Sequence, residues 1–517
     1  MVNVTPSTWR VAFRVDAGTE IGTGHVMRCL TLAARLREQG AETHFICRVQ
    51  GDYLDRLIEP QGHELHFLPQ ASDPQLVACN EPYASWLGVT IERDANDTKQ
   101  LLSTIRPDLL VVDHYGIDAR WETVVRSYVD KILVIDDLAN RPHDCDVLLD
   151  QNVLRNADSR YTGLVSEHCQ LLLGPRYALL RPEFGLARRH HPHLRLEVKR
   201  VLIFFGGSDQ HDLTSLVLDS LEQLSDLDIS VDVVVGAANL QSKSIEQRCR
   251  KNAKLNFFRQ IDNMATLMSN ADLAFGAAGG ASWERCCLAL PTILINFAEN
   301  QIELACELAR KRVLINLGLN TEMNAGSIER VLRKLIKRPS LMQRMSSRAG
   351  RLVDGRGAER IALILRRDAS QLRPAQPDDV EQVWRWRNAP TTRQHFFDSS
   401  PVSLKDHRAW WLENICKSDR VLLIGSVGAI NIGVLRFDVS GVKAVISIYI
   451  DPDLTGQGLG TSLTNKGLEW IKSSRPDILT VEAQVKPANE ASRRMFISTG
   501  FKEEYTSLSW SREQSID

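Results

Sequence analysis

The pattern that most constrains this chain is an apolar run that passes through a glycine turn into a segment with helical periodicity. Residues 11–15 read VAFRV, and the amphipathic stretch 24–38 follows the turn EIGTG. Gly22 and Gly24 allow the backbone to approach a ligand closely, and amides at the start of a helix favour an anion. The pattern therefore predicts a strand, a ligand-binding loop and a helix.

The histidine at the start of this predicted helix is the first candidate catalytic residue. His25 follows Gly24 directly and would lie beside a bound phosphate or sugar. An imidazole, with an ordinary pKa near about 6.5, is suited to remove a proton from water at neutral pH. A capping or packing histidine would fit the same pattern.

Similar apolar runs, separated by charged segments of helical period, recur over the first two thirds of the chain. They indicate two doubly wound parallel sheets. The runs of the first sheet are 11–15, 43–47, 109–113 and 132–135, and those of the second are 201–205, 231–235, 273–275 and 292–295.

A length of 517 residues suggests about three domains. A basic, turn-forming stretch at 188–195, RRHHPHLR, reads as a solvated linker, and RPAQPD at 373–378 marks a second boundary. The expected domains are thus 1–187, 188–371 and 372–517. Three histidines in the first linker lack a partner cluster that would favour a metal site.

Charge and cysteine content restrict the class of partner. The 63 basic and 64 acidic residues give a formal charge of −1, which offers no electrostatic reason to expect nucleic acid or membrane. No apolar run reaches the ~20 residues that span a bilayer, and the start does not resemble a leader, so a cytoplasmic protein is expected. The ten cysteines contain no C-x-x-C pair, so neither a disulfide framework nor a metal site is expected.

Polar residues follow several predicted strands, on the side where parallel sheets bind ligands. Glu284 follows the glycine turn on a predicted helix and could accept both hydroxyls of a ribose, or could be a surface glutamate. Asp113 could line a sugar pocket or cap the next helix. The other candidate substrate contacts are Asn152, Gly279, Gly280, Ser282, Asn300 and Gln301.

Five stretches within residues 9–365 resemble, in order, the UDP-sugar hydrolases of pseudaminic acid biosynthesis. They are RVDAGTEIGTGHVMRCLTLA, VVDHYGIDARWE, VIDDLANRPHDCDVLLDQN, FFGGSD and GGASWERCCLALPTILINFAENQ. The resemblance implies a GT-B arrangement of the two Rossmann-like domains, His25 as general base, and hydrolysis of UDP-2,4-diacetamido-2,4,6-trideoxy-β-L-altropyranose without a metal.

The last part of the chain carries a second glycine turn. Residues 444–450 alternate as a strand does, and DLTGQGLGTSL follows. Such a turn can hold a pyrophosphate on its amides at a helix N-terminus. The candidate cofactor contacts are Gly456, Gln457, Gly458, Gly460, Thr461, Asn489 and Ser492.

Together with VEAQVKPANEASRRMFISTGF, this turn resembles the GNAT acetyltransferases, which implies a third, mixed α/β domain that uses acetyl-CoA. LRPAQPDDVEQVWRWRNAPTTRQHF resembles the branch that acetylates UDP-4-amino-4,6-dideoxy-N-acetyl-β-L-altrosamine. Two positions depart from the GNAT pattern: Thr455 opens the turn, and Phe496 replaces the usual acidic tyrosine. Tyr449 and Glu482 are candidates for proton handling, although both could be structural.

The chain as a whole is expected to be a bifunctional enzyme that acetylates a small UDP-sugar and then removes UDP from it. A glycosyltransferase fused to an acetyltransferase of unrelated substrate is the main alternative, and a nucleotide-sugar sensor is a third. Release of UDP with no acceptor sugar present distinguishes a hydrolase from both.

Overall fold

The computed structural model describes residues 9–18, 21–48, 54–70, 83–190, 197–224, 226–296 and 301–503. The chain divides into two compact units, residues 1–361 and 362–517. No helix in these described stretches is both long enough and apolar enough to cross a membrane.

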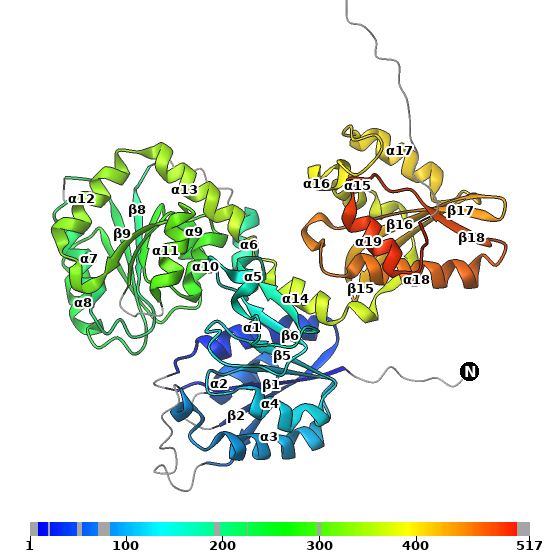
Figure 1. Ribbon diagram of the computed structural model, residues 1–517. Coiled ribbons are helices and arrows are strands. Elements are labelled where there is room, and N and C mark those ends of the chain that lie inside the picture. The colour runs from blue at the N-terminus through cyan, green and yellow to red at the C-terminus, as the bar shows by residue number, and fades with distance from the viewer. Residues whose placement is uncertain are drawn as a thin grey trace, which may run out of the picture. The chain divides into compact units, whose positions relative to one another are not determined.

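The first unit begins with a seven-stranded parallel sheet in the order β3-β2-β1-β4-β5-β6-β7 (Figure 1). Its strands are β1 (Trp9–Val15), β2 (Ala41–Arg48), β3 (Glu64–Leu68), β4 (Leu109–Asp113), β5 (Lys131–Ile135), β6 (Val147–Asp150) and β7 (Gln170–Leu173). The helices are α1 (Gly24–Glu38), α2 (Leu54–Ile58), α3 (Ile91–Ile105), α4 (Ala119–Val125), α5 (Ala157–Arg160) and α6 (Pro182–His190). The strand order reverses between β1 and β4, and at such a point a doubly wound sheet binds its ligand.

The second sheet has six parallel strands in the order β10-β9-β8-β11-β12-β13. They are β8 (Arg200–Phe204), β9 (Ser230–Val235), β10 (Leu255–Arg259), β11 (Leu273–Gly276), β12 (Thr292–Asn296) and β13 (Ile315–Leu319). Its helices are α7 (Leu213–Glu222), α8 (Ser242–Arg250), α9 (Met264–Asn270), α10 (Gly280–Cys287), α11 (Ile302–Arg310), α12 (Ala325–Ile336) and α13 (Pro339–Leu352). Helix α14 (Gly357–Leu365) follows and spans the boundary between the two units. The prediction of two parallel, Rossmann-like sheets is confirmed.

The predicted linker at 188–195 is wrong in its first residues. Residues 188–190 continue helix α6, and the Arg188 guanidinium donates to the carbonyl oxygens of Cys287 and Gly350, each at 2.7 Å. These bonds tie the helix to the second sheet. The histidines at 191 and 193 lie outside the described residues.

A fully buried ionic network lies against the first sheet. Arg14 and Arg48 both donate to Asp94 on α3, at 2.8 Å, and Trp121 Nε1 donates to the same carboxylate at 2.9 Å. Asp16 adds a second carboxylate, 2.7 Å from Arg14. The two arginines and two aspartates thus neutralise one another at a position where water does not reach to solvate their charges.

The second unit contains a mixed five-stranded sheet in the order β14-β15-β16-β17-β18, in which only the β17–β18 pair is parallel. Its strands are β14 (Gln371–Pro374), β15 (Arg420–Val427), β16 (Ile430–Ser440), β17 (Lys443–Ile450) and β18 (Thr480–Ala483). The helices are α15 (Val380–Asn388), α16 (Pro390–Arg393), α17 (Leu404–Asn414), α18 (Leu459–Ser474) and α19 (Glu490–Ser498). The expectation of a mixed sheet is confirmed.

Candidate functional site

His25 is held in one orientation by a carboxylate from the neighbouring strand. It lies in the first turn of α1, is 8% exposed, and its Nδ1 is 2.6 Å from Oδ1 of Asp113 at the end of β4. An ionised carboxylate can only accept a hydrogen bond, so Nδ1 is the donor in this contact, and in the neutral imidazole Nε2 is then the nitrogen with the lone pair. This is the arrangement that a general base requires.

Arg28, one helical turn after His25, fixes the charge of the carboxylate. Its Nε and Nη2 both donate to Asp113, and its Nη1 lies 3.4 Å from Asp137 Oδ2. Burial alone would raise the pKa of Asp113, but Arg28 and then His25 hold it well below its usual range. Asp113 is therefore ionised at neutral pH.

Three aromatic rings surround the imidazole. Tyr115 meets His25 edge to face with 4.8 Å between ring centroids, and Trp86 does so at 6.0 Å. Trp86 stacks on Tyr115, and Tyr83 contacts both rings. Such rings offer flat apolar surfaces with a polar edge, as sugar-binding pockets do.

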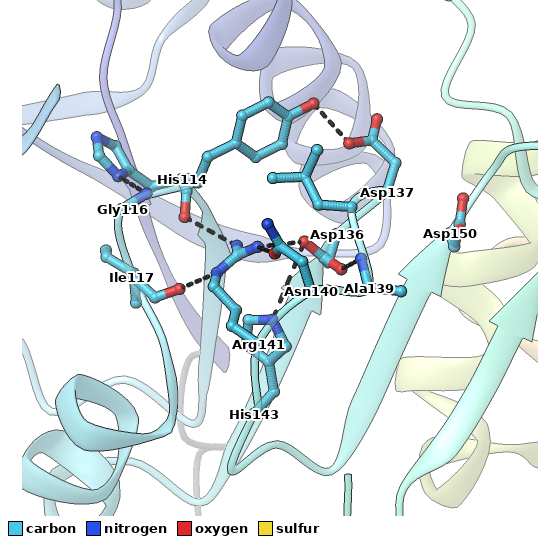
Figure 2. Close-up of polar contacts among 12 residues, drawn as sticks. His114, Gly116, Ile117, Asp136, Asp137, Ala139, Asn140, Arg141, His143 and Asp150 are labelled. Carbon is cyan, nitrogen blue, oxygen red and sulfur yellow. Dashed lines mark hydrogen bonds and ion pairs between the residues drawn. The ribbon is translucent and has the colours of Figure 1, made fainter. Parts of the chain in front are cut away.

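A group of carboxylates follows strands β5 and β6 beside this site. The Tyr115 hydroxyl donates to Asp137 at 2.5 Å, and Arg141 Nη1 donates to Asp136 at 2.9 Å. Figure 2 shows Asp136 and Asp137 after one strand and Asp150 at the end of the adjacent strand. Burial raises the pKa of Asp150 to about 7. The first sheet thus places a carboxyl group that titrates near neutrality at its ligand-binding edge.

Asn152, a predicted sugar contact, lies just beyond this carboxyl group. Its backbone N–H donates to Asp150 Oδ1 at 2.9 Å. Gly22 and Gly24 border the same edge of the sheet. Nothing lies within 4 Å of the position that a Cβ would take at either glycine, and Gly22 has a φ of +73°. The loop therefore leaves open space before α1.

The second sheet presents its own glycine turn. Gly279 has a φ of +146°, Gly280 begins α10, and the space beside both is open. Glu284, one turn further on, is mostly buried with its side chain 20% exposed, and burial raises its pKa although Arg181 lies 4.0 Å away. This places a carboxyl group near the helix start, where it can accept from a ligand hydroxyl.

The remaining predicted contacts of this sheet differ in position. Ser282 is buried, and its hydroxyl accepts from Arg285 at 3.1 Å, so its side chain supports the turn from inside. Gln301 directly precedes α11, and Asn300 lies outside the described residues.

The glycine turn of the second unit lies between β17 and α18. Gly456 and Gly458 have φ values of +78° and +76°, and Gly460 lies in the first turn of the helix, with Thr461 beside it. Gln457 is buried, and its amide has no hydrogen-bond partner among the described residues. The turn thus runs directly into α18, with left-handed glycines at two positions.

Asn489 and Ser492, the predicted contacts downstream of this turn, lie at the start of α19. Asn489 caps α19 by accepting from the backbone N–H of Ser492 at 3.2 Å. Phe496 is buried and packs edge to face on Phe501. The position of the usual tyrosine is therefore part of the core.

A cavity of about 370 Å³ opens beside Tyr449 on β17. Phe396, Trp410 and Trp411 supply apolar walls, and Arg387 and Arg436 supply positive charge. Nη1 of Arg387 is buried without a hydrogen-bond partner in the described part of the chain. An unpaired guanidinium N–H in an aromatic pocket is suited to an anionic or carbonyl oxygen of a ligand.

The two candidates for proton handling are separated on the sheet. Burial raises the pKa of Tyr449, which lies near the end of β17 at the cavity. Glu482 pairs in register with Val445, near the start of that strand, and binds Lys443 at 2.9 Å. The structure does not bring Glu482 to the cavity.

Sequence reasoning missed the residues that complete both sites. Arg28 follows His25 by one helical turn, and this spacing is a signal for a shared face. Asp137, Trp86 and Arg387 reach their sites only through the order of strands and loops, which no local pattern reveals.

Comparison with known proteins gives two domain matches. Residues 201–361 match the glycosyltransferase family 28 C-terminal domain, and residues 371–502 match the acetyltransferase (GNAT) domain. An uncharacterized protein of Methanocaldococcus jannaschii is 24% identical over 511 residues, which are 95% of this chain and 96% of that protein.

A second relative is shorter than this chain. The UDP-2,4-diacetamido-2,4,6-trideoxy-beta-L-altropyranose hydrolase of Campylobacter jejuni is 26% identical over 304 residues, 58% of this chain and 97% of that protein. The crystal structure of Acinetobacter baumannii MurG is 16% identical, with a TM-score of 0.49 over 68% of this chain and 98% of that one. The chain therefore resembles a fusion of a UDP-diacetamido-trideoxy-altropyranose hydrolase with a GNAT acetyltransferase.

Proposed function

We propose that the chain is a bifunctional nucleotide-sugar enzyme. Its GNAT domain acetylates the 4-amino group of UDP-4-amino-4,6-dideoxy-N-acetyl-β-L-altrosamine from acetyl-CoA. The first unit then hydrolyses the product, UDP-2,4-diacetamido-2,4,6-trideoxy-β-L-altropyranose, to UDP and the free sugar. The hydrolase relative supports the substrate, and the His25–Asp113 pair is the observation that carries the hydrolytic activity.

In the hydrolytic step His25 acts as general base. Its Nε2 takes a proton from water as the water oxygen bonds to the anomeric carbon and the bond from that carbon to the UDP oxygen breaks. The imidazolium that forms is stabilised by ionised Asp113, which Arg28 keeps from taking the proton. The ring wall of Trp86 and Tyr115 holds the sugar and excludes other water.

The leaving diphosphate gathers negative charge as the bond breaks. The amides at the starts of α1 and α10, at Gly24 and Gly280, are the groups that stabilise this charge. Glu284 accepts from the ribose hydroxyls, and Asn152, Asn300 and Gln301 are assigned to the substrate. No metal is needed for this account.

In the acetylation step the substrate amine attacks the thioester carbonyl of acetyl-CoA, and CoA leaves as the thiolate. The turn at Gly456–Gly460 binds the CoA pyrophosphate, with Gln457 and Thr461 beside it. The cavity beside Tyr449 holds the nucleotide sugar, with Arg387 toward an oxygen of the ligand and Trp410 against a flat ring. Tyr449, in place of the tyrosine that Phe496 replaces, donates its proton to the departing thiolate and takes up the proton that the attacking nitrogen releases.

Measuring UDP released from the diacetamido UDP-sugar, with no acceptor sugar present, tests the hydrolase. The wild type releases UDP, and His25→Ala reduces the rate by about 100- to 10,000-fold while acetyl transfer continues. His168→Ala, at an exposed position, is the matched control. UDP release that requires an added acceptor would instead establish a glycosyltransferase, the activity suggested by the family 28 match.

A further inference from the structure

Two histidines and a glutamate converge on one face of the first sheet, apart from both proposed active sites. His44 lies on β2, and Glu64 and His66 lie on β3, where residues two apart point to the same face. His44 Nδ1 is 3.2 Å from His66 Nε2 and 3.2 Å from Glu64 Oε2, and His66 Nε2 is 3.8 Å from the same Oε2. Three groups that can each donate a lone pair thus face a common point.

These separations fit a small tetrahedral ion. A metal at about 2.0–2.1 Å from each ligand, as Zn²⁺ takes with nitrogen and oxygen, has its ligands about 3.3–3.4 Å apart. The three distances scatter around that value without any rearrangement of the strands. Two imidazoles and one carboxylate are the donor set that zinc accepts, with water in the fourth position.

The surroundings of His44 also fit a metal ligand. His44 is 5% exposed, and its second nitrogen, Nε2, lies 3.6 Å from Oε1 of Glu42. Glu42 is in turn paired with Arg10, whose Nε is 3.3 Å from Oε2. At 3.6 Å the contact between Glu42 and Nε2 is longer than a hydrogen bond, so the carboxylate acts on the distal nitrogen through its charge, which favours a proton on Nε2 and leaves Nδ1 free to coordinate.

We propose that His44, Glu64 and His66 bind a zinc-type divalent cation. The site joins the start of the edge strand β3 to the middle of β2, whereas Asp113 and the His25 that it contacts lie at the carboxyl end of β4, on the side of the sheet where ligands bind. A bound ion therefore fastens the outermost strand of the sheet, and its binding energy stabilises the folded first unit.

Titration of the metal-free full-length chain, without an affinity tag, with Co²⁺ and then Zn²⁺ tests the proposal. We expect one Co²⁺ per chain with the intense visible absorption of tetrahedral cobalt, displaced by Zn²⁺. His66→Ala and Glu64→Gln, both at partly exposed side chains, should lose this absorption, whereas His168→Ala should keep it. Glu42→Gln should weaken affinity by about 10- to 100-fold, because it acts through His44.

Thermal unfolding gives a second readout. Zn²⁺ should raise the unfolding temperature of the wild type and of His168→Ala, and should leave that of His66→Ala and Glu64→Gln unchanged. No one-to-one binding by the wild type, or binding undiminished in both variants, would overturn the assignment. UDP release by the metal-free wild type is measured in parallel, so that failure of this site and failure of the hydrolase are seen separately.

Discussion

At the scale of single residues, the central relation is the one between His25 and Asp113. A histidine at the start of a helix can cap the helix, pack, or act as a base. Its Nδ1 contact to a buried, ionised carboxylate selects the tautomer that leaves Nε2 available. Asp113 itself was expected to line a pocket or cap a helix, and in the structure it orients the histidine.

Asp113→Asn should lower UDP release by about 100- to 10,000-fold. The amide can donate to Nδ1, which would move the proton to Nε2 and remove the base. Acetyl transfer by the same variant should be unchanged. Asp130→Asn, at an exposed position, serves as the control, and normal hydrolysis by Asp113→Asn would show that the pairing has no catalytic role.

Asp150 should make the first unit less stable as the pH rises from about 4 to about 7. Its pKa is raised from 3.8 to about 7 by burial, so in this range the folded state holds a proton that the unfolded state has released. The loss is at most ~4 kcal/mol and is complete above pH 7. The free energy of unfolding, measured with denaturant at pH 5 and pH 8, should change less in Asp150→Asn than in the wild type. An equal change in the two proteins would contradict this.

At the scale of elements, the strand–turn–helix units could be predicted because each is a local pattern. Helix α1 spans Gly24–Glu38 and strand β4 spans Leu109–Asp113, as the periodicity indicated. Strand β3, Glu64–Leu68, was not predicted, because an edge strand is half exposed and its alternation is interrupted by histidine and glutamate. The metal-type cluster on it was invisible for the same reason, since it exists only after β2 and β3 are placed in register.

The glycine turn before α18 should fail when a carboxylate is introduced. Gly458→Glu should weaken CoA binding by at least about 100-fold, because the φ of +76° disfavours a side chain and the added charge repels the pyrophosphate. UDP release from pre-acetylated substrate should continue. Gly441→Glu, in a hairpin turn with a φ of +58°, has comparable strain and should bind CoA normally in calorimetry.

Equal affinity for CoA in wild type and Gly458→Glu would mean that the turn only connects β17 to α18.

The residue that takes the place of the usual tyrosine at Phe496 could not be assigned from the sequence. The sequence showed that the usual tyrosine is absent, but the candidates to replace it could be separated only by strand register. The register puts Tyr449 at the cavity and Glu482 beside Lys443.

At the scale of the whole molecule, the start of the second unit matters for its independent folding. The unit begins at Ala362, whereas the sequence suggested a domain from Leu372. Leu363 belongs to the core of the second unit, and the Ser462 hydroxyl donates to the carbonyl of Arg367 at 2.8 Å and bonds to Ser370 at 2.7 Å.

A fragment of residues 357–517 should therefore be more stable than one of residues 372–517. Loss of a buried leucine alone costs about 2–5 kcal/mol. Thermal unfolding of the two fragments, with CoA binding as a check on the fold, measures the difference. Leu363→Ala within the longer fragment should account for much of it, and equal stability of the two fragments would show that the preceding segment contributes nothing.

The buried network of Arg14, Arg48, Asp94 and Asp16 has a consequence for how this chain can diverge. Losing any single member leaves the remaining buried charges unbalanced, at a cost of about 3–5 kcal/mol, yet exchanging the whole group for apolar residues can be neutral. Single substitutions at these four positions are therefore strongly destabilising and should be eliminated by selection. Descendants of this protein should keep all four residues or have replaced them together, so covariation among these positions would record ancestry rather than selection on catalysis.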